Sequence, residues 1–596
     1  MDQRHLAFLI QERVARYGDK VALRGKEDGR WYEVSWRSLG EQVHAVAKGL
    51  IELGVKETDR VGICSANRPE WTIADLAILR ARATSVPIYP TSTAKQAEYV
   101  AGDANIEVIF VGRQDQYDKA RAVSAAGRKL TMVLFDPAVR REAGDGALPF
   151  QELLEMGRKA ARDAEVEQRL ARASRDDLLT LVYTSGTTGE PKGVMLDHAS
   201  VLSALEAHDP RLLDPNEGDV SLCFLPLSHI FERCWTYYVL YRGMTNTYLE
   251  DPSKVIEALQ EVKPTIMCAV PRFYEKIYAT VFGRLRAAPP PRRKLFHWAI
   301  GVGAREGLYR KDGRRVPPAL ALQHAVADAL VLKKIRDIVG GRIKFFPCAG
   351  APLSREIEEF FWAAGIFICH GYGLTETCAT VSCHEPRGFE FGTVGRPLQG
   401  VQVRIGEDDE ILVKGPAVMR GYWGKPAATA EVLADGWFRT GDAGRLDGEG
   451  LLSITDRIKD LIKTSGGKYV APQAIEATLG SDLLIEQVAV IGDQRRFVSA
   501  LIVPAFPALE AWARAKGLAC SSREELIRHP DVLRLVQERI DAQNVGLARH
   551  EQIKKFTLLA RELTVEGGEI TPTMKIKRRR MAEKYRDAIE AMYAER

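Results

Sequence analysis

A segment rich in glycine and hydroxyl groups follows the apolar run Leu178–Val182. It reads Thr184-Ser185-Gly186-Thr187-Thr188-Gly189, and Lys192 comes three positions later. Phosphate oxygens need many N–H and O–H donors, close approach of the backbone and a cation, and this segment supplies all three. No Gly-Lys-Ser/Thr sequence closes it, so it differs from the Walker pattern. The spacing predicts a phosphate-binding loop.

Four later segments accompany this loop. They are Gly371-Tyr372-Gly373-Leu374-Thr375-Glu376-Thr377, Trp437-Phe438-Arg439-Thr440-Gly441-Asp442, Asp456-Arg457-Ile458-Lys459-Asp460 and Thr571-Pro572-Thr573-Met574-Lys575-Ile576-Lys577-Arg578. In content and order, the five segments resemble the motifs of the adenylate-forming (AMP-binding) superfamily, which includes acyl-CoA synthetases, luciferases and nonribosomal peptide adenylation domains. The resemblance covers essentially the whole chain.

The resemblance implies a site for ATP and Mg²⁺. Adenylation joins two anions, a carboxylate and ATP, so positive charge must offset their repulsion. The family pattern makes Glu376 and the Thr184 hydroxyl the magnesium ligands, and Thr375 a further phosphate contact. It makes Asp442 the acceptor for both ribose hydroxyls and Arg457 a second ribose or phosphate contact. The adenine slot would be formed by Gly350-Ala351-Pro352 and His370-Gly371-Tyr372, with the Tyr372 ring available for stacking.

Lys575 stands where the family has its C-terminal catalytic lysine. An ammonium group that reaches both the carboxylate and the α-phosphate would hold the reactants together and stabilise the developing charge. In the family the C-terminal domain then rotates about a hinge residue, which aligns with Lys459. The rotation presents the loop from Lys463 to Lys468, whose glycines permit close approach of the pantetheine arm of CoA. Thr573-Met574 before the lysine is similar to long-chain members.

The segment Leu225-Pro226-Leu227-Ser228-His229 resembles the wall of the acyl pocket in long-chain fatty acyl-CoA synthetases. His229 is either a contact for the substrate carboxylate or a packing residue. Five aromatic residues near it could line an apolar tunnel, but such residues more often fill a core, as we expect for at least three of them. They are Phe231, Trp235, Tyr237, Tyr238 and Tyr241. A fatty acid is the best substrate hypothesis, because no acidic or amide residue suited to an amino acid stands out.

Apolar runs of strand length alternate with helix-length segments from residue 45 to about residue 455. The runs are Arg60–Cys64, Ser85–Ile88, Val108–Val111, Thr131–Phe135, Leu178–Tyr183, Val220–Leu225, Thr265–Ala269, Ile343–Cys348 and Ile366–Cys369. This rhythm predicts parallel βαβ units. We therefore expect an α/β fold with a large N-terminal body of two packed sheets (residues 1–455), which includes a β-rich subdomain at about 390–455. A hinge (456–460) and a small, mobile α+β C-terminal domain (461–596) would follow.

Composition excludes several classes of protein. The 596 residues are 46% hydrophobic and 27% charged, which is ordinary for a folded protein and unlike a disordered or disulfide-scaffold chain. A net charge of +5 is small for this length, so no nucleic-acid partner is expected. The nine cysteines are scattered without a C-x-x-C pair, which favours buried free thiols in a reducing compartment. No secretion signal and no segment long enough to span a bilayer is visible, so a cytoplasmic location is expected.

The basic stretch 289–315 contains Arg292, Arg293 and Lys294 with interleaved aromatic residues, and it would lie on the surface. Either it contacts an anionic membrane peripherally or it is a solvated, salt-bridged helix. No obligate protein partner is predicted.

The leading functional hypothesis is a ligase that uses ATP and CoA to convert a fatty acid into acyl-CoA, AMP and pyrophosphate. One alternative is an enzyme that passes the acyl group to a carrier-protein thiol. Another is a non-catalytic, membrane-associated protein that binds acyl groups or nucleotides, although such a protein would not need Lys575.

Overall fold

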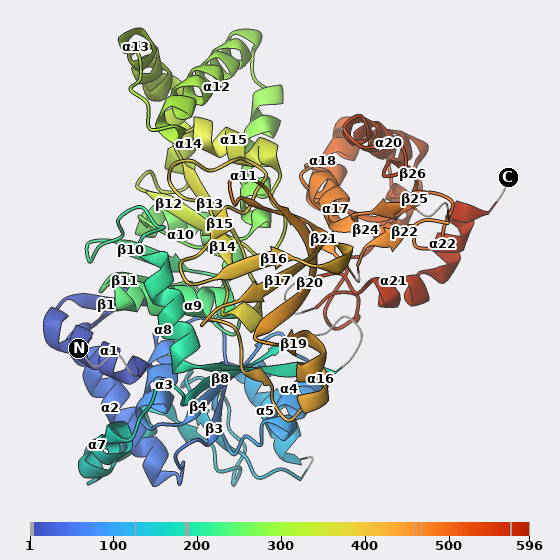
Figure 1. The fold of residues 1–596 in the computed structure, drawn as a ribbon. Coiled ribbons are helices and arrows are strands. Elements are labelled where there is room, and N and C mark those ends of the chain that lie inside the picture. Colours follow the sequence, from blue (N-terminus) through green and yellow to red (C-terminus); the bar gives the residue numbers. More distant parts are fainter. Residues whose placement is uncertain are drawn as a thin grey trace.

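The structure is a computed structural model of the chain, and it describes residues 5–125, 127–184, 190–458, 460–465, 468–571 and 575–594. An eight-stranded sheet forms one side of the N-terminal body (Figure 1). In spatial order its strands are β18 (Gly421–Tyr422), β9 (Lys192–Asp197), β8 (Leu178–Thr184), β4 (Thr84–Ile88), β3 (Arg60–Cys64), β5 (Val108–Val111), β6 (Thr131–Leu134) and β7 (Leu148–Pro149). The pairs from β8 to β7 are parallel, which confirms the expected βαβ construction, whereas β9 runs antiparallel to β8.

A second sheet lies across the body. Its strands are β10 (Val220–Cys223), β11 (Thr245–Tyr248), β1 (Val21–Glu27) and β2 (Arg30–Ser35), continued by β12 (Phe345–Cys348), β13 (Phe367–Tyr372), β14 (Ser382–Cys383) and β15 (Arg396–Pro397). Ile266 bridges the two halves, because it pairs with both Ser221 and Phe345. The prediction of a continuous strand at Thr265–Ala269 is therefore wrong, because only isolated β-bridges form there, at Ile266 and Ala269.

Helices cover both sheets and fill the space between them. The helices of the N-terminal body are α1 (Leu6–Tyr17), α2 (Trp36–Glu52), α3 (Pro69–Arg80), α4 (Ala94–Asp103), α5 (Gln114–Ala125), α6 (Phe150–Lys159), α7 (Asp163–Ala171), α8 (His198–His208), α9 (Ile230–Tyr241), α10 (Val255–Val262), α11 (Pro271–Arg286), α12 (Pro290–Lys311), α13 (Pro318–Ala327), α14 (Lys333–Ile338), α15 (Arg355–Ala363) and α16 (Pro426–Val432). Residues of α8 and α9 share one buried core with Val182 of the first sheet and Phe345 of the second. The two sheets are therefore packed against each other through these helices.

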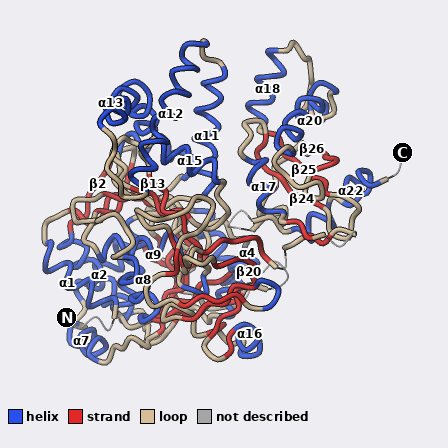
Figure 2. Tube along the Cα trace, turned by 45° about the horizontal axis from the view of Figure 1, so that its top comes forward, coloured by secondary structure: helices blue, strands red, loops and turns tan. Residues whose placement is uncertain are grey.

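The remaining strands confirm the expected β-rich part and the smaller C-terminal part. A five-stranded sheet contains β16 (Gln402–Ile405), β17 (Glu410–Lys414), β20 (Trp437–Leu446), β19 (Leu433–Ala434) and β21 (Leu452–Arg457). The C-terminal part contains β22 (Ile462–Lys463), β23 (Tyr469–Val470), β24 (Ile485–Ile491), β25 (Val498–Pro504) and β26 (Ile553–Leu558), with helices α17 (Pro472–Gly480), α18 (Phe506–Ala515), α19 (Arg523–Leu526), α20 (Pro530–Asn544), α21 (Arg578–Lys584) and α22 (Arg586–Tyr593). Both views show this part beside the N-terminal body (Figures 1 and 2).

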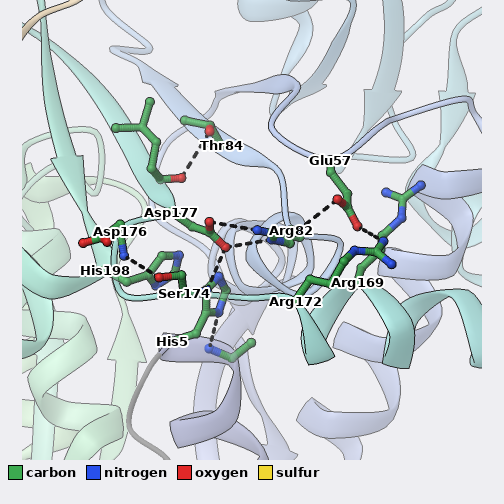
Figure 3. Close-up of polar contacts among 12 residues, drawn as sticks. His5, Glu57, Arg82, Thr84, Arg169, Arg172, Ser174, Asp176, Asp177 and His198 are labelled. Atoms are coloured by element: carbon green, nitrogen blue, oxygen red, sulfur yellow. Dashed lines mark hydrogen bonds and ion pairs between the residues drawn. The ribbon is translucent and has the colours of Figure 1, made fainter.

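Strand β8 is fixed firmly at its start (Figure 3). The guanidinium of Arg82 donates two hydrogen bonds to the carboxylate of Asp177, at 2.8 and 3.1 Å, and the Ser174 amide donates to the same carboxylate. Thr84 donates a hydrogen bond to the carbonyl oxygen of Leu178. A two-point pair between Arg and a carboxylate restrains orientation as well as distance. The other end of this buried strand, where Thr184 lies, is therefore held in a defined position.

Candidate active site

The phosphate-binding loop predicted from the sequence connects two antiparallel strands. Thr184 ends β8 and lies opposite Lys192, the first residue of β9. The Lys192 ammonium lies 4.8 Å from the centre of the Tyr422 ring. Ser185, Gly186, Thr187, Thr188 and Gly189 lie outside the described residues. The hairpin thus places the Thr184 hydroxyl at the end of one strand and the Lys192 ammonium at the start of the other.

Glu376 is held close to that hairpin by Tyr422. Thr375 to Thr377 form a short 3₁₀ turn, and the Tyr422 hydroxyl donates a 2.9 Å hydrogen bond to Oε1 of Glu376. Tyr422 lies on β18, which pairs with β9, so one side chain links the lysine of the first motif to the acid of the second. The sequence did not predict this role of Tyr422, because no motif contains the residue and its position follows from strand pairing.

Gly373 allows this turn to close. A Cβ atom at residue 373 would lie 2.0 Å from the carbonyl oxygen of Ala379, so no larger residue fits there. The backbone at Cys378 and Ala379 has positive φ, at 50° and 77°, which completes the reversal after the turn. The geometry of the chain around Glu376 therefore depends on this glycine.

Asp442 lies at the centre of a second polar group. It is opposite Arg457 on the paired strands β20 and β21, and its carboxylate contacts the Arg457 guanidinium at 3.2 Å. The Tyr372 hydroxyl donates a 2.6 Å hydrogen bond to the other carboxylate oxygen. Burial raises the pKa of Asp442, while Arg457 and Tyr372 oppose that rise. Tyr372 therefore orients Asp442, a role that the sequence did not predict.

The residues expected around adenine follow two adjacent parallel strands. Gly350-Ala351-Pro352 come just after β12, and His370, Gly371 and Tyr372 end β13. His370 is buried, and its Nδ1 lies 2.7 Å from the buried Glu358 carboxylate. Glu358 also accepts a 2.7 Å hydrogen bond from the Gly392 amide. His370 is thus part of a fixed wall, and the exposed Gly350 and Ala351 face solvent beside it.

Lys575 comes from the C-terminal part and approaches both acidic positions. Its ammonium is close enough to Asp442, Glu376, Asp460 and Arg457 for all four charges to act on it. The surrounding polypeptide and the positive charge of Arg457 lower the pKa of Lys575 to about 8, against the opposing effect of the carboxylates, although the side chain remains open to solvent. Thr571 accepts a 3.0 Å hydrogen bond from the Lys575 amide.

Two further lysines named from the sequence are Lys463 and Lys459. Lys463 lies on β22, and its ammonium is 5.4 Å from the centre of the Tyr469 ring. Lys459 lies outside the described residues.

His229 begins helix α9 and caps it. Its Nδ1 accepts a 3.1 Å hydrogen bond from the Phe231 amide, so the neutral ring carries its proton on Nε2. Burial and the positive charge of Lys575 lower the pKa of His229 to about 4. At neutral pH this side chain is therefore an uncharged hydrogen-bond donor close to Lys575. The Asn67 side chain fixes the preceding segment, because its amide N–H donates a 2.7 Å hydrogen bond to the Leu225 carbonyl oxygen and its Oδ1 accepts a 3.0 Å hydrogen bond from the Leu227 amide.

An apolar pocket adjoins this helix. Its walls come from α8, α9 and the strands that end near residue 371, and they include Phe231, Trp235, Tyr238, Leu205 and Gly371. Trp235, Tyr237 and Tyr238 are buried in the main core, as expected for at least three of the five aromatic residues, and Phe231, Trp235 and Tyr238 also border the pocket. The hydroxyls of Tyr237 and Tyr241 donate to Asp75 and Asp209, respectively. The three residues that border the pocket have the spacing of one helix face.

The cysteines follow the sequence-based expectation. All nine are free thiols, and eight of them are buried. Four of the buried thiols border the apolar pocket next to the aromatic residues. A fifth, Cys378, approaches one of them, with 3.6 Å between the sulfur atoms of Cys234 and Cys378. Within the described ranges, no three His, Cys, Asp or Glu residues are grouped in a way that could hold a metal ion without other ligands.

We expect the adenylation rate to fall as the pH rises through about 8, because the free protein then loses the Lys575 ammonium. The measurement is kcat/KM for ATP from pyrophosphate release without CoA, and the loss should approach roughly tenfold for each further pH unit. In Lys575→Arg the falling limb should move to higher pH, since a guanidinium stays protonated. A wild-type profile that stays flat well above pH 8 would contradict this prediction.

Comparison with known proteins shows the family of the chain. The chain belongs to the AMP-binding enzyme family, which matches residues 10–423, and residues 459–596 match the C-terminal domain of AMP-binding enzymes. It is 37% identical to the long-chain-fatty-acid–CoA ligase FadD15 of Mycobacterium bovis, over 99% of this chain and 97% of that protein. It is also 30% identical to the long-chain-fatty-acid–CoA ligase ACSBG2 of Xenopus laevis, over 98% of this chain and 83% of that protein.

A solved structure shows the same fold. The adenylation domain of a carboxylate reductase from Mycobacterium chelonae superposes with a TM-score of 0.78 at 22% identity, over 100% of this chain and 92% of that one. At this identity, the likeness concerns the fold alone.

Proposed function

We propose that this protein activates a long-chain fatty acid with ATP and transfers it to CoA. The observation that carries the proposal is the convergence of Glu376, Asp442 and Lys575 from three separate parts of the chain, with an apolar pocket beside them. The curated relatives named long-chain-fatty-acid–CoA ligases support the same substrate class. They do not favour a carrier-protein ligase or a non-catalytic binding protein.

The reaction follows from the charges of these side chains. A carboxylate oxygen of the fatty acid attacks the α-phosphorus of ATP, the bond to the bridging oxygen breaks, and pyrophosphate leaves. Lys192 and Lys575 supply positive charge for this step, Asp442 accepts the ribose hydroxyls, and neutral His229 donates a hydrogen bond to the acid. In the second step, the sulfur of CoA attacks the acyl carbon and AMP leaves.

The site offers two protein oxygen atoms for a magnesium ion. Glu376 has one oxygen bonded to Tyr422 and a second that remains available, and Thr184 supplies a hydroxyl at the end of β8. One or two oxygen ligands from protein, completed by phosphate oxygens and water, are typical for Mg²⁺. Bound Mg²⁺ would neutralise charge on the phosphates.

The division of the chain into a body (1–455), a hinge (456–460) and a mobile lid (461–596) is part of this proposal. Lys575 must be present for adenylation and must withdraw for attack by the thiol. The pantetheine arm would then approach through the loop from Lys463 to Lys468, as in the family. Nine free thiols support a reducing, cytoplasmic environment.

The decisive assay combines purified protein, ATP and Mg²⁺ with carboxylic acids of increasing chain length. Pyrophosphate release without CoA reports the adenylate, and the thioester yield with CoA reports the whole cycle. We expect both signals to be greatest for long-chain acids. If no acid in the series gives an adenylate, the proposal is wrong. An adenylate that is never passed to CoA would instead favour a carrier-protein acceptor.

We also propose that helices α12 and α13 form a peripheral docking surface for an anionic bilayer. The two helices project from the body (Figure 1). Helix α12 carries six basic residues and one acidic residue, and Arg292, Arg293 and Lys294 are all exposed. On α13 and the turn after it, Leu322, Val326 and Leu330 are exposed at spacings of four residues, and Leu322 is 70% exposed. Exposed apolar side chains and exposed positive charge on neighbouring helices suit the interface of an anionic membrane.

Among the described residues, no helix is both long enough and apolar enough to cross a bilayer, so this contact would be interfacial. We expect sedimentation with anionic vesicles to weaken by about 100-fold in the variant Arg292→Ala/Arg293→Ala/Lys294→Ala, at about 1 kcal/mol per charge. Leu322→Asp should weaken binding as well. Val545→Asp is the matched control, because Val545 is an exposed apolar residue of the C-terminal part. Equal binding by wild-type protein and all three variants would exclude this surface.

A further inference from the structure

Arg272 joins the N-terminal body to the C-terminal part. It is the second residue of α11, and its guanidinium donates hydrogen bonds to the carbonyl oxygens of Gly480 and Glu486, the latter at 3.0 Å. It also lies 3.3 Å from the Glu486 carboxylate. Gly480 is the last residue of α17, so the cation lies at the negative end of that helix dipole.

Two further contacts lie along the same face of α11. Lys276, one turn after Arg272, lies 3.4 Å from the Glu486 carboxylate. Leu483 packs over Gly283, where a Cβ atom would come within 2.6 Å of the leucine side chain. Helix α11 therefore contacts the end of α17, the loop after it and the start of β24.

Arg272 lies where its positive charge is unfavourable for its own helix. A positive charge in the first turn of a helix is unfavourable for that helix, because the N-terminus carries partial positive charge. One partner of Arg272, the Glu275 carboxylate, lies on the same helix at 3.4 Å. The other partners lie on the other side of the interface, where charge-assisted hydrogen bonds to carbonyl oxygens favour docking. The arrangement therefore stabilises the contact between the two parts of the chain.

Helix α17 also holds the segment that carries Lys575. Arg578, three residues after Lys575, makes a two-point ion pair with Glu476 of α17, at 2.6 and 2.7 Å. Arg578 also donates to the Val490 carbonyl oxygen at 3.1 Å. Arg272 and Arg578 therefore both bind α17. A shift of α17 relative to α11 would consequently move the segment that carries Lys575.

We propose that Arg272 is a positioning residue that holds the C-terminal part in the arrangement where Lys575 reaches the adenylation site. The inference rests on the proposed function. Breaking these contacts would accompany the withdrawal of Lys575 before thiol attack. Arg272 therefore favours the first half-reaction over the second.

The test compares the two half-reactions in Arg272→Ala. Pyrophosphate release should fall about 10-fold, the scale of one lost charged hydrogen bond, whereas thioester formation from supplied acyl-adenylate should be unchanged or faster. In a Lys575→Ala background, Arg272→Ala should cause no further loss of adenylation, because its effect acts through Lys575. Leu483→Asp, on the opposite side of the interface, should give the same split if Arg272→Ala folds poorly. Arg286→Ala, at the other end of α11, is the matched control and should behave as wild type.

The inference is overturned if both interface variants form adenylate at the wild-type rate, or if they lose both half-reactions equally. It is also overturned if the losses from Arg272→Ala and Lys575→Ala multiply. Failure of the proposed function would look different, because the wild-type protein itself would then form no adenylate.

Discussion

Replacing Lys575 with alanine is expected to slow adenylate formation by about 10²–10³-fold, the effect of removing one donor that stabilises the transition state. Lys575 approaches Asp442 and Glu376, and under the proposed function its ammonium would contact both the α-phosphate and the substrate carboxylate. Thioester formation from supplied acyl-adenylate should be spared, because the lysine serves only the first step. Pyrophosphate release and thioester yield, measured separately, check this expectation.

Lys577→Ala is the matched control for this variant, since Lys577 lies two residues away in the same basic segment. Its adenylation rate should stay close to that of the wild type. An equal loss of both half-reactions in Lys575→Ala would show that the lysine is not the adenylation residue.

Removing the carboxylate of Asp442 should be at least as damaging. In Asp442→Ala the ribose loses its acceptor, and the Arg457 guanidinium and the Tyr372 hydroxyl lose their partner in a buried setting. Two lost hydrogen bonds to a charged group correspond to roughly a 10²–10⁴-fold lower kcat/KM for ATP. The loss should appear mainly as weaker binding of ATP and AMP, which calorimetry measures directly.

Tyr372→Phe separates orientation from direct contact. This variant keeps the carboxylate and removes only the 2.6 Å hydrogen bond that orients it, so the loss should be much smaller than in Asp442→Ala. Wild-type nucleotide affinity in Asp442→Ala would rule out the ribose assignment.

Local motifs were enough to anticipate much of this site. Thr184, Glu376, Asp442 and Lys575 each lie in a segment whose neighbours are as informative as the residue itself, and the structure brings three of them together. The α/β rhythm likewise predicted the parallel strands, because buried strands and amphipathic helices differ in period. The same rhythm did not predict the direction of β9, which is antiparallel to β8.

The residues that the sequence did not reveal act through tertiary contacts. Tyr422 reaches Glu376 because β18 pairs with β9, and Arg272 reaches α17 because two distant parts of the chain dock. Some aromatic residues of α9 border the apolar pocket and others, such as Tyr237, do not, according to which helix face each occupies. None of these partners lies at a sequence distance that a motif could encode.

The position of helix α9 has a consequence for selectivity toward acyl chain length. It begins with His229, and its wall of the apolar pocket extends from Phe231 to Tyr238. At 1.5 Å per residue, that stretch measures about 10 Å along the helix axis. Under the proposed function, α9 would border the carbons nearest the carboxyl group. Carbons farther along a long chain would then lie toward Leu205, His208 and Leu212, so selectivity for length should vary with these residues while the carboxyl end stays in register.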